Sequence, residues 1–286
     1  MQTHQDGVTI SDPGAWQKKI DSFRAMGINR LQVISDWDRT LTDPHSSRGL
    51  DQSTYSLLHT SNLLGSSFSS KSAALYNTYR QIELSTEIDV SEKFIKMDAW
   101  WTAQFDLLTA HGFGEPTVRS IAERGQLTMR DGVWEFLRHL HRHEIPLLIL
   151  SAGIANIIEA RIRFNQANTP NVHICANRFP MAPDGLAMDF ARPLIHTLNK
   201  SSADNTQAFQ EASANRTALI VLGDTLEDIE MKKLSPQCAV ISIGFLCDPS
   251  LSEKFLRVYD AVIAPDGSFA FVNELLAAIS SGSSAS

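Results

Sequence analysis

The sequence predicts an α/β protein, with a doubly wound, Rossmann-like parallel sheet and an inserted α-helical cap domain. Three observations favour this fold class. Short apolar runs recur along the chain and are continuous rather than alternating, as in strands that are buried on both faces. Segments of helical periodicity separate these runs. A stretch from about residue 46 to residue 130 carries helical patterns and no clear strand, which indicates an insert.

The expected strands are short and end in polar or small residues. The three clearest are Leu31–Ser35, Pro146–Leu150 and Ala218–Leu222, and two more follow at Ala239–Ile243 and Ala261–Ile263. Because the insert follows the first of these runs, we expect the sheet to be interrupted there and completed by the second half of the chain.

Helices are predicted on both sides of the second strand and within the insert. Val133–His143 precedes that strand and Ala155–Phe164 follows it, each with apolar residues on one face. Within the insert, the helical segments are Tyr76–Ile82, Ser91–Thr109 and Pro116–Glu123. The serine-rich stretch Ser66–Ser72 is expected to be a loop.

These patterns divide the chain into a core and a cap. We expect residues 1–45 and 131–279 to form the catalytic α/β core and residues 46–130 to form the helical cap. Residues 280–286 are Ser, Gly and Ala and are expected to be a flexible tail.

The bulk composition is that of an ordinary globular protein. The chain has 286 residues, a hydrophobic fraction of 43% and a net charge of -7, which argues against a nucleic-acid polymer as partner. No run approaches the roughly 18 apolar residues of a spanning helix, and no leader pattern opens the chain, so we expect a cytoplasmic monomer without membrane contact. The cysteines Cys175, Cys238 and Cys247 are too few and scattered for a zinc cluster or a disulfide framework.

Polar residues cluster where the expected strands end, which is where ligands bind in open parallel sheets. Four clusters occur in order along the chain: Asp36 and Asp38; Ser151, Ala152 and Gly153; Lys200; and Gly223, Asp224 and Asp228. Taken singly, each has an ordinary structural explanation as a turn, a helix cap or a surface lysine. Together they supply an attacking carboxylate, carboxylates for a hard cation, and donors for phosphate oxygens, which indicates phosphoryl transfer.

The same clusters resemble the ordered motifs of the haloacid-dehalogenase superfamily. The motif D-x-D-x-T reads DWDRT and ends at Thr40, and the later motifs read SAG, Lys200 and GDTLED. More narrowly, the segments LQVISDWDRTLT, IPLLILSAGIANIIEA, LIHTLNK and LIVLGDTLEDIEM resemble the cytosolic pyrimidine 5′-nucleotidase (type III) family. The similarity extends over most of the chain from Leu31 to Cys247, and includes Tyr79–Glu83 and Val90–Trp101 of the insert.

The resemblance implies a haloacid-dehalogenase-like core and a role for each motif residue. Asp36 is expected to attack the phosphorus and form an aspartyl phosphate, and Asp38 to protonate the leaving oxygen and then activate water. Mg²⁺ is expected to bind the carboxylates of Asp36 and Asp224 and the backbone carbonyl of Asp38.

Four further residues are implied to hold the phosphate, and two to support the site. Ser151, the amide of Ala152 or Gly153, and Lys200 would bind phosphate oxygens. Asp228 would orient Lys200 or a metal-bound water, and Thr40 completes the first motif.

The insert is expected to select the leaving group. Glu92 lies where the family places a base-binding glutamate, and the neighbouring Trp100 and Trp101 could stack on a base. The alternative is structural: Glu92 as a carboxylate at a helix start, and a tryptophan in the cap core. The sequence departs from the family over Asp43–Leu50 and at Trp101 and Gln104.

These features rank the candidate functions. Hydrolysis of pyrimidine nucleoside 5′-monophosphates such as CMP and UMP comes first. 7-Methylguanosine monophosphate is the alternative substrate, because a cationic base would gain from an indole face and a carboxylate. A phosphatase for another small ester such as phosphoserine comes next. A non-catalytic binding protein has the least support, because no motif residue is missing.

Overall fold

The computed structural model describes residues 2–4, 7–45, 53–85, 87–123, 127–202 and 206–281. Its strands are β1 (Gln2–His4), β2 (Val8–Ile10), β3 (Leu31–Ser35), β4 (Leu147–Ile154), β5 (Val172–Asn177), β6 (Ala218–Gly223), β7 (Ala239–Phe245) and β8 (Ala261–Ile263). Its α-helices are α1 (Pro13–Met26), α2 (Thr54–Thr60), α3 (Gly65–Leu84), α4 (Val90–Ala110), α5 (Glu115–Glu123), α6 (Val133–Arg142), α7 (Ala155–Phe164), α8 (Gln207–Ala212), α9 (Ser252–Val258) and α10 (Ala270–Ser280). Four 3₁₀ segments are η1 (Ile28–Arg30), η2 (Lys200–Ser202), η3 (Glu227–Leu234) and η4 (Pro249–Leu251).

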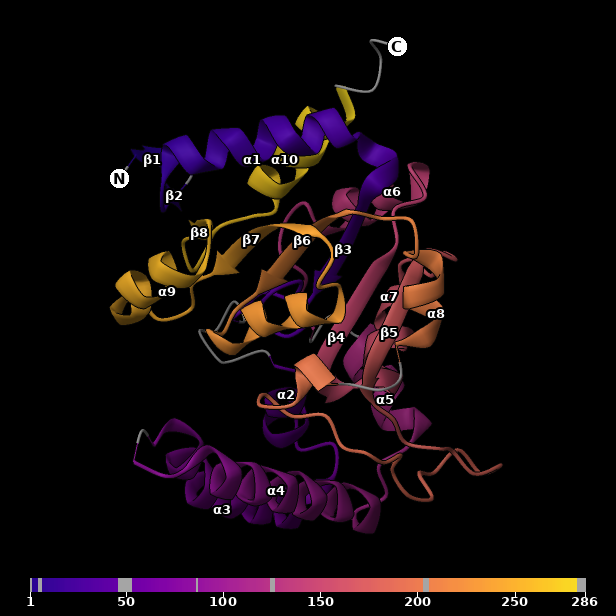
Figure 1. The fold of residues 1–286 in the computed structure, drawn as a ribbon. Helices are drawn as coiled ribbons and strands as arrows, with labels where there is room; N and C mark the ends of the chain where they lie inside the picture. The colour runs from indigo at the N-terminus through magenta and orange to yellow at the C-terminus, as the bar shows by residue number, and fades with distance from the viewer. Residues whose placement is uncertain are drawn as a thin grey trace.

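All the named strands belong to one sheet, in the order β1-β2-β8-β7-β6-β3-β4-β5 (Figure 1). The strands from β8 to β5 run parallel, and β2 pairs antiparallel with β8 and β1 at one edge. β3 lies between β6 and β4, although the three strands are far apart in sequence. This arrangement confirms the predicted doubly wound α/β fold.

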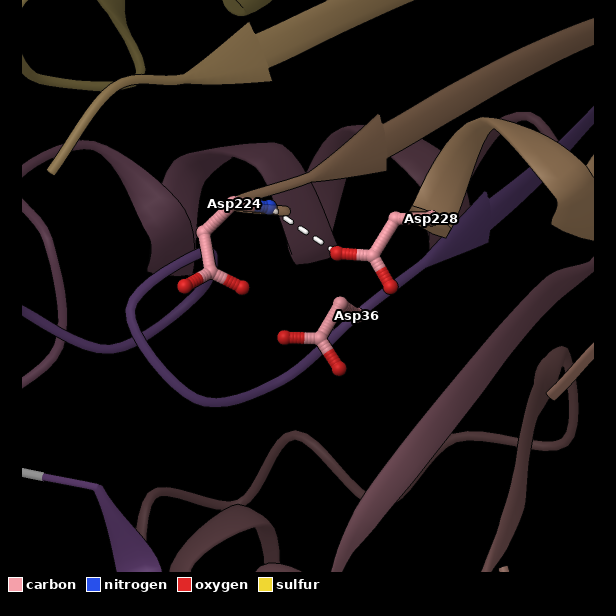
Figure 2. A group of neighbouring side chains, drawn as sticks. All are labelled: Asp36, Asp224 and Asp228. Atoms are coloured by element: carbon pink, nitrogen blue, oxygen red, sulfur yellow. Dashed lines mark hydrogen bonds between the residues drawn. The ribbon is translucent and has the colours of Figure 1, made fainter. Parts of the chain in front are cut away.

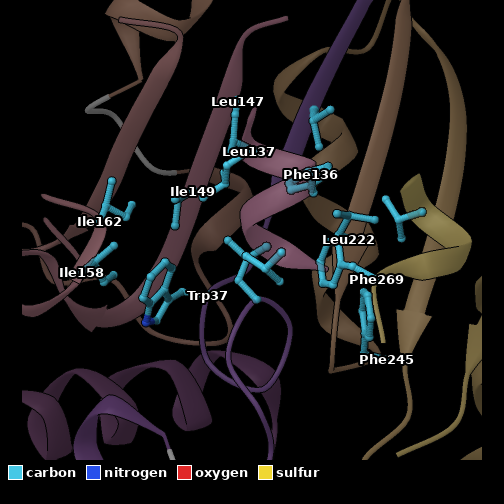
Figure 3. Packing of buried hydrophobic residues seen from close by; sticks show 14 of the residues in the cluster. Trp37, Phe136, Leu137, Leu147, Ile149, Ile158, Ile162, Leu222, Phe245 and Phe269 are labelled. Atoms are coloured by element: carbon cyan, nitrogen blue, oxygen red, sulfur yellow. The ribbon is translucent and has the colours of Figure 1, made fainter. Parts of the chain in front are cut away.

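The two faces of the sheet pack against different helices because side chains alternate along each strand. On one face, Val33, Ile149 and Ile220 join residues of α1, α6, α7 and α10 in the main core. Figure 3 shows part of this core, with Leu147 and Ile149 of β4 labelled. On the other face, Ile34, Leu148, Leu150, Leu219 and Val221 pack with residues of α8 and η3. Since both faces are covered, every residue of β3 is buried, including the polar residues Gln32 and Ser35.

The predicted strands are all present, but the apolar-run criterion missed three others. β5 has the polar residues His173 and Asn177 among its 6 residues, and the edge strands β1 and β2 are only 3 residues long. The expected loop Ser66–Ser72 is wrong, because these residues belong to α3. Phe68, which is fully buried, anchors this serine-rich turn through its contact with His111 beyond the end of α4, so tertiary packing overrides the weak helix propensity of serine.

The segment between β3 and α6 is helical in the residues that the structure describes. α3 and α4 form a pair that lies away from the sheet, whereas α2 contacts β4 and α5 packs against α7 (Figure 1). The two ends of the segment meet: Thr42 and Met129 form an antiparallel bridge, and Arg130 donates its N–H to the carbonyl of Leu41. The division at residues 46 and 130 stays a prediction, as does the flexible tail, since residues 46–50 and 282–286 lie outside the described residues.

Within the described ranges, the apolar stretches of the helices are all too short to cross a membrane.

Candidate active site

The motif residues meet at the carboxyl ends of the three central strands. Ser35 of β3 is in register with Leu222 of β6 on one side and with Ile149 of β4 on the other. The residues that follow these positions therefore lie side by side, although about a hundred residues of chain separate β3 from β4. Asp36 is held at this point by its N–H, which donates to the carbonyl of Leu222.

Three carboxylates form the centre of the site. Asp36, Asp224 and Asp228 each offer an oxygen, and these oxygens lie within 4.8 Å of one another (Figure 2). The exposed fractions of the three residues are only 3%, 9% and 1%. Carboxylates buried this closely repel one another and need positive charge nearby.

The ammonium group of Lys200 supplies part of that charge. Its Nζ lies 2.5 Å from Oδ1 of Asp36 and 2.8 Å from Oδ1 of Asp228. Burial acts to lower the pKa of Lys200, but the two paired carboxylates outweigh it and raise this pKa, so the amine stays charged. Burial raises the pKa of Asp36 well above its ordinary value, with Lys200 opposing the rise and Asp228 and Asp224 adding to it. Asp228 was expected to orient Lys200 or a metal-bound water, and its carboxylate accepts a hydrogen bond from Lys200.

The turn after β6 fixes Asp224 and Asp228 relative to each other. Oδ2 of Asp228 accepts from the backbone N–H of Asp224 at 3.1 Å and of Thr225 at 3.0 Å. Gly223 permits this turn, because a Cβ at that position would lie 2.3 Å from Cβ of Asp228. The hydroxyl of Tyr259 donates to the carbonyl of Thr225 and braces the same turn.

Asp38 is turned toward α2 and β4 rather than toward the carboxylate cluster. Its Oδ1 accepts from the N–H of Thr54 at 2.6 Å and from the Thr54 hydroxyl at 2.7 Å. Gly153 lies beside its other oxygen: a Cβ on Gly153 would be 3.1 Å from Oδ2 of Asp38 and 3.1 Å from Oγ of Ser151. The structure therefore brings Asp38, Ser151 and Gly153 together, next to Asp36.

The Ser151–Gly153 segment differs from the sequence-based expectation in one respect. These residues lie within β4, which runs to Ile154, whereas we expected them to follow the strand. The pairing of β4 with β5 shifts register between Leu150 and Ile154, so this irregular stretch is free to turn its amide and hydroxyl groups toward the site. Asn177 fixes it by donating to the carbonyl of Ala152 at 2.8 Å.

Sequence reasoning missed three polar residues at the site. Thr54 donates a hydrogen bond to Asp38. The local sequence around Thr54 indicates only a helix start, with Ser53 as the N-cap of α2. Nε of Arg39 lies 2.8 Å from Oδ2 of Asp224. Arg130, which is 2% exposed, donates from Nη2 to the carbonyl of Arg39 at 2.8 Å. A buried arginine that serves backbone carbonyls leaves no pattern in the local sequence.

Thr40 is fully buried, and its hydroxyl has no hydrogen-bond partner among the residues that the structure describes. Trp37, the second residue of the same DWDRT motif, belongs to the main core, as does Ile158 (Figure 3). The two variable positions of the DWDRT motif thus differ, since Trp37 anchors the loop and Arg39 faces the carboxylates.

The predicted base-binding residues lie on α4. Glu92 is exposed in the first turn of this helix. Trp100 is buried and stacks on Tyr79 of α3, with ring centroids 5.8 Å apart. Trp101 is only half-buried and contacts the ring of Tyr55 edge-on at 5.6 Å. Tyr55 follows Thr54, so Trp101 packs against the same helix, α2, that holds Asp38.

The carboxylate cluster fits a hard divalent cation. Its side-chain donors are all carboxylate oxygens, which Mg²⁺ prefers. Among the residues that the structure describes, the ion pairs of the cluster join three carboxylates to two cations, Lys200 and Arg39, and these five side chains together carry one net negative charge. Sequence reasoning placed Asp36, Asp38 and Asp224 around the metal, and the structure adds the carboxylate of Asp228 to this group.

The chain is similar to known 5′-nucleotidases over nearly its whole length. Residues 40–280 match the family model described as pyrimidine 5′-nucleotidase (UMPH-1). A relative from Xenopus laevis, 7-methylguanosine phosphate-specific 5′-nucleotidase B, is 33% identical over 277 residues, which cover 95% of each chain. The human 7-methylguanosine phosphate-specific 5′-nucleotidase is 33% identical over 94% of this chain and 91% of its own.

Solved structures agree with this relationship. The crystal structure of cytosolic 5′-nucleotidase IIIB bound to cytidine superimposes with a TM-score of 0.87 and 29% identity, covering 98% of this chain and 95% of that one. A haloacid-dehalogenase family hydrolase from Salmonella enterica shares the fold at 15% identity and a TM-score of 0.57, covering 86% of this chain and 71% of its own. The chain therefore belongs to the pyrimidine 5′-nucleotidase family, its core has the haloacid-dehalogenase-like fold, and it is a phosphoric monoester hydrolase.

Proposed function

We propose that this protein is a Mg²⁺-dependent 5′-nucleotidase that works through an aspartyl phosphate on Asp36, with 7-methylguanosine monophosphate as its preferred substrate. The observation that carries the chemistry is the buried carboxylate cluster with Lys200 bridging Asp36 and Asp228. A buried carboxylate that is held by an ammonium and faces neighbouring phosphate-binding groups suits an in-line attack on phosphorus.

The two aspartates of the DWDRT motif divide the work. An oxygen of Asp36 attacks the phosphorus and the bond to the 5′ oxygen breaks, while Asp38 gives that oxygen a proton and releases the nucleoside. Asp38, now a carboxylate, takes a proton from the water that attacks the phosphorus of the aspartyl phosphate, which frees phosphate and Asp36. Thr54 supports this exchange because it fixes one oxygen of Asp38 and leaves the other on the side of Gly153 and Ser151.

Lys200, Ser151 and the amide of Ala152 would hold the phosphate, since the amide of Gly153 already donates to Ser151. The Ser151 hydroxyl oxygen accepts from the Gly153 N–H at 2.9 Å, so its own hydrogen can be donated to a phosphate oxygen. Lys200 is in contact with the nucleophile and can contact a phosphate that approaches it. Donors placed in a buried site stabilise the charge that develops in the transition state.

Asp36, Asp224 and the backbone carbonyl of Asp38 would hold Mg²⁺, with Asp228 close by. When bound, the cation offsets the negative charge of the carboxylates and of the phosphate. Burial and the neighbouring carboxylates raise the pKa of Asp36, and added positive charge would favour its ionised form, which the attack requires.

The substrate preference rests on the cap and on the relatives. Trp101 and Tyr55 form an aromatic corner near Asp38, and the exposed carboxylate of Glu92 can accept hydrogen bonds from a base. A cationic base gains more than a neutral one from both features. The relatives from Xenopus laevis and human are named as specific for 7-methylguanosine phosphate. CMP is the second candidate, because the family model is named for pyrimidine nucleotides and cytosolic 5′-nucleotidase IIIB was solved with cytidine.

Phosphate release from a panel of 7-methyl-GMP, CMP, UMP, AMP and phosphoserine tests this proposal. We expect release with Mg²⁺ from the first two, fastest from 7-methyl-GMP, and none from the Asp36→Asn variant. Glu92→Gln should raise KM for nucleotides, while Glu87→Gln, which changes another exposed carboxylate, should not. Activity on phosphoserine alone would refute the nucleotidase proposal, and a higher kcat/KM for CMP than for 7-methyl-GMP would refute the proposed preference.

A further inference from the structure

Arg39 occupies a position that the D-x-D-x-T motif leaves open, yet its side chain enters the carboxylate cluster. Its Nε lies 2.8 Å from Oδ2 of Asp224, a proposed metal ligand. The side chain of Asp224 is 5% exposed and that of Arg39 is 32% exposed. A partly exposed cation is thus paired with a buried anion.

The backbone of Arg39 is held by contacts on both sides of its peptide. Arg39 has a φ of 61°, a left-handed conformation that costs energy in a non-glycine residue. Arg130 donates to the Arg39 carbonyl from Nε at 3.2 Å and Nη2 at 2.8 Å, and the Arg39 N–H donates to Oγ1 of Thr42 at 2.8 Å. Nη1 of Arg130 also donates to the carbonyls of Pro265 and Gly267, which ties the loop to the core. These contacts aim the guanidinium at Asp224.

The charges of the cluster show what this ion pair does. Asp36, Asp224 and Asp228 together carry three negative charges, and Lys200 with a divalent cation would carry three positive charges. For these described residues, the charges would balance without Arg39. With Arg39 on Asp224 and no metal, the same side chains carry one net negative charge. The guanidinium and a divalent cation therefore compete for the same carboxylate.

We propose that Arg39 is a counter-ion that pairs with Asp224 in the metal-free protein and is displaced by Mg²⁺. The affinity for Mg²⁺ is then weaker than it would be without the charge of Arg39. This inference rests on the proposed Mg²⁺ dependence and extends it to a residue that the motif does not specify. Removing the guanidinium charge should tighten metal binding, because Asp224 would then have no competing cation. The same change should destabilise the metal-free protein, which would keep a buried carboxylate without its partner.

Two substitutions separate the charge of Arg39 from its shape. Arg39→Gln removes the charge and keeps a shorter aliphatic stem, a hydrogen-bond donor and the backbone strain. Arg39→Lys keeps the charge on a similar stem. Arg119→Gln is the control, because it removes an arginine charge from α5, where Arg119 is 68% exposed and pairs only loosely with Glu123 at 4.0 Å.

Mg²⁺ binding is measured by calorimetric titration of the metal-free proteins, and thermal unfolding is followed with and without Mg²⁺. We expect the Kd of Arg39→Gln to be about fivefold lower than that of the wild type, as for the loss of one partly exposed ion pair. Its Tm without metal should be lower, and its rise in Tm on adding Mg²⁺ should be larger. Arg39→Lys and Arg119→Gln should bind Mg²⁺ like the wild type.

The outcomes distinguish the two proposals. If the wild type binds Mg²⁺ and Arg39→Gln binds it equally well or more weakly, the role of Arg39 is refuted while the proposed metal stands. Binding to Arg39→Gln alone would support the counter-ion role in its strongest form. Binding to neither protein would refute both the proposed metal and the role of Arg39.

Discussion

The centre at the strand ends and the aromatic face of the cap are built in different ways. At the strand ends, three carboxylates and two cations are locked by short hydrogen bonds and by backbone N–H groups. On α4, Trp100, Trp101 and Glu92 contact aromatic rings or solvent, and ring contacts fix an orientation less tightly than paired charges do. The difference matches two tasks, since phosphate is the same in every nucleotide whereas the base varies.

The difference between the two regions predicts how a substitution in each should affect activity. A change at the strand ends leaves a buried charge unpaired, so it should affect every substrate equally. A change on the cap face should alter the ratio between substrates and spare the chemistry. The following variants test that separation.

Lys200→Met should have the largest effect. It removes the ammonium that lies 2.5 Å from Asp36 and 2.8 Å from Asp228. We expect kcat to fall about 10³-fold for 7-methyl-GMP and CMP alike, the size typical of losing one charge-stabilising donor. Steady-state kinetics measure this loss, and circular dichroism checks the fold. A loss that differs tenfold or more between the two nucleotides would break the separation between core and cap.

Gly223→Ala tests how tightly the turn after β6 is packed. The added Cβ would lie 2.3 Å from Cβ of Asp228, so the turn must shift. We expect the free energy of unfolding to fall by about 1–3 kcal/mol, as in other overpacked sites. Denaturant unfolding measures it. Gly14→Ala in α1 is the control, because its Cβ would meet no atom closer than 3.4 Å, and little change is expected.

Trp101→Ala tests the cap face. Base stacking on an aromatic ring contributes about 1–3 kcal/mol, so we expect kcat/KM for nucleotides to fall about ten- to a hundredfold. Hydrolysis of p-nitrophenyl phosphate, which lacks a nucleobase, should change far less. Trp100→Phe keeps an aromatic ring on Tyr79 and should preserve the substrate ratios. Equal losses on both types of substrate in Trp101→Ala would show that Trp101 supports the fold rather than the base.

His196 joins the two regions and should give the smallest effect. It is fully buried, and its ring contacts Phe94 of α4 with centroids 4.7 Å apart. Burial lowers the pKa of His196 below its ordinary value of 6.5, against the opposing charges of Asp98 and Glu83. The folded protein favours the neutral His196 ring. The stability that depends on this neutral ring is therefore fully present above pH 6.5, and it is lost as the pH falls below 6.5.

Urea unfolding at pH values from about 7 to about 5 measures this contribution, because that range spans the ordinary titration of histidine. As the pH falls across this range, the free energy of unfolding should decrease less for His196→Asn than for the wild type. We expect the two decreases to differ by about 1 kcal/mol. His141→Gln, which changes an exposed histidine, should follow the wild type. Parallel curves for His196→Asn and the wild type would rule out this role.

The sequence predicted the centre at the strand ends better than the cap. Asp36, Ser151 and Asp224 could be found because each follows a continuous apolar run, and parallel pairing brings the ends of such strands together. Arg39 and Arg130 could not, because an arginine directed at a carboxylate or a carbonyl across the fold has no local pattern.

The cap shows the same limit. Parts of α3, α4 and α5 were predicted, but α2 was not. The serine-rich start of α3 was also missed, because the packing of Phe68 decides it. The pattern on α4 placed one tryptophan in the core, and the structure identifies the buried one as Trp100. Which ring faces the site depends on the contact between Trp101 and Tyr55, which joins α4 to α2.

The central claim is that one nucleophile serves whatever base the cap admits. Its most direct test is a rapid acid quench of the protein with 7-methyl-GMP or CMP carrying a radiolabelled 5′-phosphate, followed by mapping of the labelled peptide. We predict label on Asp36 from both nucleotides, labile to hydroxylamine as an acyl phosphate is, and no label on Asp36→Asn. Label on another residue, or label that persists in Asp36→Asn, would contradict the account.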